Sequence, residues 1–142
     1  MTKKEKVPEK IKKAIRDKIY KYQKLLNALD YRGDIRYIKK DEGDKDEDGN
    51  VIGHVLAKAI VDHRYLIADF EIFPRFVKKI KEKQISPESI DEIIAHEVAH
   101  IATQKLYYMA TSIYKDEGET KDAWESLTTV IGRLLVDLGE KK

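Results

Sequence analysis

The chain has 142 residues, which suffice for one domain with a modest core and are too few for two. Its 28 Lys and Arg residues nearly balance its 26 Asp and Glu residues, so no strong field favours nucleic acid or an anionic membrane as a partner. Without cysteine, the chain has no disulfide framework and no thiol to bind metal or attack a substrate.

The N-terminal sequence is charged rather than apolar. Met1 is soon followed by Lys-Lys-Glu-Lys, so no secretory signal is expected. No stretch of the sequence reaches the apolar length that spans a bilayer. We therefore expect a cytoplasmic, soluble domain over residues 1–142, with flexible tails at 1–7 and 140–142.

A long helix is predicted at the start of the chain. Apolar residues recur at helical spacing over residues 11–29, with charged residues between them. Pro8 suits the first turn, and Gly33 ends the helix shortly after Leu29. Residues 34–39 then favour a short strand.

A charged loop is predicted over residues 41–50. Asp44, Asp46 and Asp48 alternate before Gly49, which matches the first half of a calcium loop. The twelfth position of that loop would be Val55 instead of a bidentate Glu, and the flanks are typical of strands. A solvated turn rich in Asp and Gly is the better interpretation.

Two strands and a short helix are predicted next. Residues 55–62 and 65–73 are rich in Val, Ile, Ala and aromatic residues, and they favour a hairpin that turns near 62–64. Pro74 ends this sheet region. Apolar residues within 76–80 indicate a short helix.

Two longer helices complete the chain. Ser86 as N-cap and Pro87 in the first turn start a helix that keeps its apolar pattern to about Tyr114. Thr120 can cap a last helix that runs to Gly139. The order of elements predicts an α+β fold with a small antiparallel sheet of two to three strands.

Residues 96–100 read His-Glu-Val-Ala-His, the most informative segment of the chain. On a helix, His96 and His100 lie on one face, so both imidazoles can reach one ion. Glu97 lies one step round, able to take a proton from a metal-bound water but badly placed to be a ligand. This is the geometry of the H-E-x-x-H zinc hydrolases.

A catalytic zinc usually has three protein ligands and an open position, so a third ligand must come from elsewhere. Glu125 is favoured because a helix fixes a side chain firmly and because it lies beside the apolar stripe of the last helix. The plain alternative is a solvated Glu125. Glu119 has a suitable spacing from His100, but its Gly-flanked setting resembles a loop. The other histidines, His54 and His63, fall in the strand region.

These elements together resemble the minimal gluzincin metallopeptidases (minigluzincins), relatives of thermolysin reduced to the active-site half of the catalytic domain. The segments Arg64-Tyr-Leu-Ile-Ala68 and Asp122-Ala-Trp-Glu125 are also similar to small HExxH proteins of phages and archaea. The resemblance covers roughly residues 51–138 and is most specific in the metal-binding pentapeptide.

The resemblance implies a role for each of these residues. His96, His100 and Glu125 would bind Zn²⁺, and Glu97 would be the general base. One of the strands within residues 55–73 would be the rim along which an extended peptide or protein substrate pairs. No nucleic-acid or membrane partner is expected.

The chain departs from the larger gluzincins at two points. They place an Asp four residues after the ligand Glu to orient a metal-binding His, and here that position is Thr129. A hydroxyl could substitute, although such changes typically lower metal affinity or activity. No residue clearly matches their oxyanion-stabilising Tyr or His. Tyr107, Tyr65 and His63 are candidates whose ordinary interpretation is structural.

Three hypotheses follow for the function. The first is zinc-dependent peptide-bond hydrolysis with Glu97 as general base. The second is a catalytically weak or inactive zinc-binding module that docks a partner peptide on its sheet edge. In the third, the motif is accidental and His96 and His100 are core residues of a helical binding protein. Glu97 favours the first, because a structural site has no use for a base there.

Overall fold

Four helices and two small sheets form the α+β fold that the sequence predicts. The computed structural model describes residues 6–45, 48, 51–113 and 117–140. Within them, no helix has both the length and the apolar character needed to cross a membrane. The elements in chain order are α1 (Glu9–Leu25), β1 (Ile35–Tyr37), β2 (Glu42–Lys45), β3 (Val51–Val55), β4 (Ala57–Asp62), β5 (Ile67–Ile72), α2 (Pro74–Lys81), α3 (Pro87–Ile113) and α4 (Glu117–Glu140).

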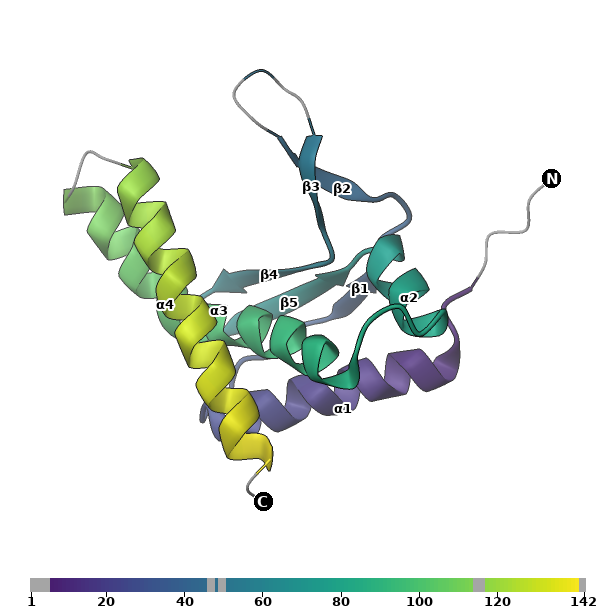
Figure 1. Cartoon of the computed structure of the whole chain (residues 1–142). Coiled ribbons are helices and arrows are strands. Elements are labelled where there is room, and N and C mark those ends of the chain that lie inside the picture. Colours follow the sequence, from purple (N-terminus) through teal and green to yellow (C-terminus); the bar gives the residue numbers. More distant parts are fainter. Residues whose placement is uncertain (1–5, 46–47, 49–50, 114–116, 141–142) are drawn as a thin grey trace.

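The helices and sheets are arranged so that one edge of the larger sheet faces α3 and α4. In Figure 1, α1 and α3 lie along the same side of the three-stranded sheet, and α4 runs back along α3. The β2–β3 hairpin projects away from the sheet. Strand β4 contacts α3, and a hydrogen bond between Ala59 and Glu97 places the His-Glu-Val-Ala-His segment of α3 beside this strand.

The three-stranded sheet has the order β1–β5–β4. The predicted hairpin is confirmed: β4 and β5 pair antiparallel, from Ala57 opposite Ile72 to Asp62 opposite Ile67. Strand β1 joins β5 in parallel, which makes the sheet mixed rather than purely antiparallel. Because β4 pairs on one side only among the described strands, its other edge is open.

One hydrophobic core joins α1, α3 and the sheet. Alternate residues of β5 are buried on the face toward the helices, as expected for a half-covered sheet. The helices bury residues at helical spacing against them. The most buried large side chains of this core are Ile15, Tyr22, Ile72, Phe76, Ile94 and Val98.

The local sequence predicted the start of α3 correctly and the end of α1 incorrectly. Ser86 is the N-cap of α3, since its Oγ accepts a hydrogen bond from the Ser89 N–H at 3.1 Å. Helix α1 ends at Leu25 instead of continuing to Leu29, because Asn27 adopts a left-handed conformation with φ of 58°. Leu29 is therefore 42% exposed instead of buried.

Part of the predicted charged loop is a strand. Residues 42–45 form β2, which pairs antiparallel with β3 from Glu42 opposite Val55. Pairing with β3, a strand that contains several β-branched residues, thus outweighs the local preference of an acidic segment for a turn. Asp46 and Gly49 of the calcium-like pattern lie outside the described residues.

The start of α4 also differs from the prediction. The helix begins at Glu117, so Thr120 lies inside it and is not its cap. The acidic and Gly-containing segment that favours a loop is held in the helix that packs on α3.

Tyr22 links α1 to α3 through a buried hydroxyl. Its side chain is 1% exposed. Burial raises the pKa of Tyr22 to about 12, and the charges of Asp91 and Glu140 and a hydrogen bond to Asp91 act in the same direction. The folded state therefore holds this proton more tightly than the unfolded chain does.

We expect Tyr22 to control part of the loss of stability in alkali. Its contribution to the free energy of unfolding is complete below about pH 10. That contribution is lost as the pH rises toward 12, because Tyr22 ionises at a lower pH in the unfolded chain than in the folded protein. Between about pH 10 and 12, the free energy of unfolding measured in urea should fall by roughly 2 kcal/mol less in Tyr22→Phe than in the wild type. At pH 7 the variant should be roughly 1 kcal/mol less stable, because its hydrogen bond is gone.

Tyr20→Phe is the matched control, since Tyr20 is 58% exposed on the same helix. It should follow wild type at every pH. An equal decrease in the free energy of unfolding at alkaline pH in the wild type and in Tyr22→Phe would contradict this account of Tyr22.

Candidate metal centre

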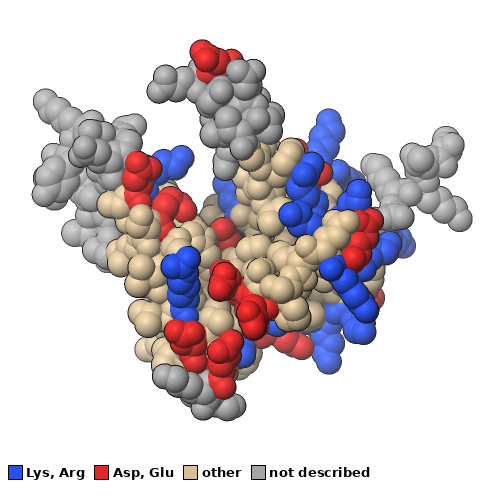
Figure 2. Space-filling model, in the orientation of Figure 1, with Lys and Arg blue, Asp and Glu red and all other residues tan. Residues whose placement is uncertain are grey.

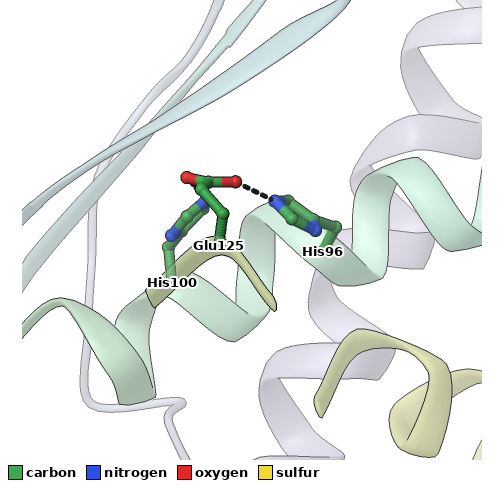
Figure 3. A group of neighbouring side chains, drawn as sticks. All are labelled: His96, His100 and Glu125. Carbon is green, nitrogen blue, oxygen red and sulfur yellow. Dashed lines mark hydrogen bonds and ion pairs between the residues drawn. The ribbon is translucent and has the colours of Figure 1, made fainter. Parts of the chain in front are cut away.

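Three side chains from two helices converge on one point (Figure 3). His96 and His100 lie on one face of α3, with ring centroids 4.9 Å apart. Glu125 reaches them from α4: its Oε2 lies 3.2 Å from His96 Nε2, and its Oε1 lies 3.7 Å from His100 Nε2. One ligand atom from each residue lies within 4.8 Å of the others, so the three could hold one ion.

Glycine lets the two helices approach closely at this site. A Cβ atom added to Gly132 of α4 would lie 3.0 Å from both the Cα and the N of His96. These are backbone atoms, so no side-chain rotation could relieve the contact. The absence of a side chain at Gly132 therefore sets the helix spacing at which Glu125 reaches the histidines.

Thr129, which follows Glu125 by four residues, contacts His96. Its Oγ1 lies 3.3 Å from His96 Nδ1 and donates a hydrogen bond to the Glu125 carbonyl at 3.0 Å. Since the hydroxyl proton is used there, the oxygen is left to accept from an Nδ1–H. With its Nδ1–H directed to Thr129, His96 donates its Nε2–H to Glu125, and loss of that second proton would leave the Nε2 lone pair for an ion.

His100 is the more deeply buried of the two histidines, with a residue exposure of 6%. Burial lowers the pKa of His100 to about 4; the charge of Glu125 opposes this shift and that of His96 adds to it. His100 is therefore neutral at pH 7, which is the form that binds metal.

The other two groups form a hydrogen-bonded pair. Burial alone would lower the pKa of His96, but the hydrogen bond to Glu125 and the charges of Glu97 and Glu125 outweigh it and raise that pKa. The hydrogen bond from His96 lowers the pKa of Glu125, more than its burial raises it. Glu125 thus remains an ionised carboxylate, and the donor set of two imidazoles and one carboxylate fits a zinc ion.

Glu97 is hydrogen-bonded to the sheet instead of to the three candidate ligands. Its Oε2 accepts a hydrogen bond from the Ala59 N–H of β4 at 2.9 Å. Burial raises the pKa of Glu97 to about 7, against the charge of His96 and the bond from Ala59. One carboxylate oxygen is thereby fixed, and the other remains free to act.

The four residues lie in a cleft of about 1050 Å³ between the open edge of β4 and the two helices. Its walls carry charges of both signs, and the face drawn in Figure 2 likewise intersperses Lys and Arg with Asp and Glu. Each helix contributes a row of residues spaced by four. The α3 row is Glu92, His96, His100 and Gln104, and the α4 row is Lys121, Glu125, Thr129 and Arg133.

The oxyanion candidates do not line this cleft. Tyr65 is 70% exposed at the turn after β4. His63 Nδ1 is hydrogen-bonded to the Tyr31 hydroxyl at 2.7 Å, and Tyr107 stacks on Trp124 with ring centroids 4.3 Å apart. His63 and Tyr107 thus contact side chains outside the candidate ligand group, and the structural interpretation of the three residues stays a prediction.

The remaining histidine and the alternative ligand are also accounted for. His54 is exposed on β3, away from the ligand group. The side chain of Glu119 lies outside the part of the chain that the structure describes.

Some residues of the site carried no signal at the level of motifs. Gly132 and the Ala59 backbone bond depend on contacts between distant elements. Lys121 and Arg133 could have been predicted from their spacing, because residues separated from Glu125 by multiples of four lie on the same face of a helix.

Comparison of the chain with protein-family models, with curated proteins and with solved structures found no match. The resemblance to minigluzincins therefore remains an inference from the residues of the motif and their setting.

We expect Gly132→Ala to weaken metal binding. The added methyl group must push α4 away from His96, which moves Glu125 and Thr129 away from the imidazole. The affinity for Zn²⁺, measured by competition with a chromogenic chelator, should fall on the order of tenfold.

Gly139→Ala is the matched control in the same helix, since its Cβ would chiefly meet the flexible end of Lys21. It should bind Zn²⁺ as wild type does. Unchanged affinity in Gly132→Ala would show that the helix spacing does not depend on this glycine.

Proposed function

We propose that this protein binds Zn²⁺ through His96, His100 and Glu125 and hydrolyses peptide bonds with Glu97 as general base. The observation that carries the proposal is the convergence of three possible ligand atoms within 4.8 Å, beside the carboxylate of Glu97 in a shared cleft. Two imidazoles and a carboxylate leave one position open in a tetrahedral site, which is the arrangement of catalytic zinc.

Glu97 is positioned to move protons. A bound Zn²⁺ supplies a Lewis acid and lowers the pKa of water at the site. One oxygen of Glu97 is held by the Ala59 N–H at 2.9 Å, so its other oxygen can accept a proton from the attacking water. Glu97 then returns this proton to the leaving amine when the peptide bond breaks.

The edge of β4 supports an extended peptide as the substrate. The Ala59 N–H points away from β5, because it donates to Glu97. In an antiparallel strand this orientation alternates, so the backbone groups of Ala57 also face the open edge within the cleft. An extended peptide could add there as a further strand, with its backbone beside the metal ligands.

A second candidate is a zinc-binding module that docks a peptide on the same edge without cleaving it efficiently. Two observations favour it. Glu97 already occupies the Ala59 N–H that a substrate backbone would use, and the described part of the cleft is lined by no Tyr and by no His besides His96 and His100. Both candidates share the metal site and differ in turnover.

Metal analysis tests the ligands. We expect the wild type to hold about one equivalent of zinc after dialysis, and His96→Ala to lose it, because a removed ligand lowers affinity directly. His54→Ala is the control, since His54 is exposed on β3. Zinc retained by His96→Ala at the wild-type level, or a different metal in the wild type, would contradict the zinc assignment.

Glu97→Gln separates hydrolysis from binding. The amide oxygen can still accept from the Ala59 N–H, so zinc should remain while cleavage of an unfolded protein substrate slows at least about a hundredfold. Glu92→Gln is the control, because Glu92 lies in the cleft one helical turn before His96. Cleavage that survives in Glu97→Gln would remove it from the mechanism, and a wild type that binds peptide but never cleaves would favour the docking module.

A further inference from the structure

His100 is held differently from His96. The imidazole of His96 has the Thr129 hydroxyl at Nδ1. In contrast, Nδ1 of the buried His100 finds no hydrogen-bond partner among the described residues. Metal-binding histidines are normally fixed by such a bond, so another interaction must orient this ring.

Trp124 is the neighbour that can do so. Its ring lies 4.7 Å from the His100 ring, centroid to centroid, at an interplanar angle of 54°. Tyr107 also stacks on Trp124 with an interplanar angle of 22°. The indole is thus packed between α3 side chains, which leaves it poorly suited to serve as a stacking platform for a substrate ring.

A chain of hydrogen bonds fixes the indole. Its Nε1 donates to Thr103 Oγ1 at 3.0 Å, and the Thr103 and Thr128 hydroxyls lie 2.8 Å apart. Thr128 donates to the Trp124 carbonyl at 2.7 Å, so the single hydroxyl proton of Thr103 serves the short contact to Thr128 in preference to the Ala99 carbonyl, which lies 3.4 Å away. The chain therefore starts and ends at Trp124. Both threonines are fully buried, where an unpaired hydroxyl would be costly.

We propose that Trp124 is a positioning residue for His100, and that the buried Thr103–Thr128 pair holds Trp124 in place. Packing against the indole, instead of a hydrogen bond to Nδ1, directs Nε2 of His100 toward Glu125. Because Trp124 directly precedes Glu125, the same contacts couple a ligand on α3 to a ligand on α4. This inference rests on the proposed metal site but is independent of catalysis.

Two conservative variants test the proposal. Trp124→Phe keeps an aromatic ring but removes the Nε1 donor, and Thr103→Val removes its acceptor at nearly constant volume. Each should lower the affinity for Zn²⁺ about tenfold and alter the visible spectrum of the Co²⁺ form. A merely structural role would lower the unfolding temperature of the metal-free protein and leave affinity and spectrum unchanged, which would overturn the proposal.

Tyr31→Phe is the matched control. It also removes one hydrogen bond, the one between the Tyr31 hydroxyl and His63, but outside the cleft. It should change stability without changing the affinity for Zn²⁺.

The wild type provides a measurement that needs no variant to fold. Trp124 is the only tryptophan in the chain, so its emission should change during a Zn²⁺ titration with the midpoint of metal binding. Constant emission up to saturation would contradict the contact with His100. If the wild type binds no zinc, the proposed function fails. NMR of the metal-free protein then tests whether the His100 ring packs against the Trp124 indole. Nuclear Overhauser effects between the His100 and indole rings are expected, and their absence would overturn the proposal.

Discussion

The close packing of α4 on α3 at Gly132 is the constraint on which the rest of the site depends. The His-Glu-Val-Ala-His motif supplies two imidazoles on α3, but the carboxylate that completes the candidate site comes from α4 and must reach across the space between the helices. With the backbone of His96 only 3.0 Å from where a Cβ of Gly132 would lie, Glu125 spans that space. The spacing also brings Thr129 to His96.

Burial at this contact imposes a second requirement, because each polar group removed from water needs a partner. His96 has Thr129 and Glu125, and Glu97 has the backbone of β4. Within the described part of the chain, Nδ1 of His100 has no hydrogen-bond partner, and the ring is packed against Trp124 instead. Two histidines of one motif are thus oriented by different means, one by a hydroxyl and the other by an aromatic ring.

The sequence predicted what depends on local signals and on helix geometry. The Ser86 cap, the hairpin of β4 and β5 and the shared face of His96 and His100 follow from short patterns, and Glu125 follows from its place beside an apolar stripe. Contacts between segments that are distant in the sequence could not be predicted from these short patterns. The strand at residues 42–45 exists through pairing with β3, and the importance of Gly132 is visible only once the helices are packed.

The most direct test of the central claim is a crystal structure of the protein with Zn²⁺, with the ion located by its anomalous scattering. The account predicts one zinc bonded to Nε2 of His96, Nε2 of His100 and a carboxylate oxygen of Glu125 at about 2.0 Å, with solvent at the fourth position. A zinc elsewhere on the surface would contradict the site. A fourth protein ligand would contradict the open position, and with it the hydrolytic function.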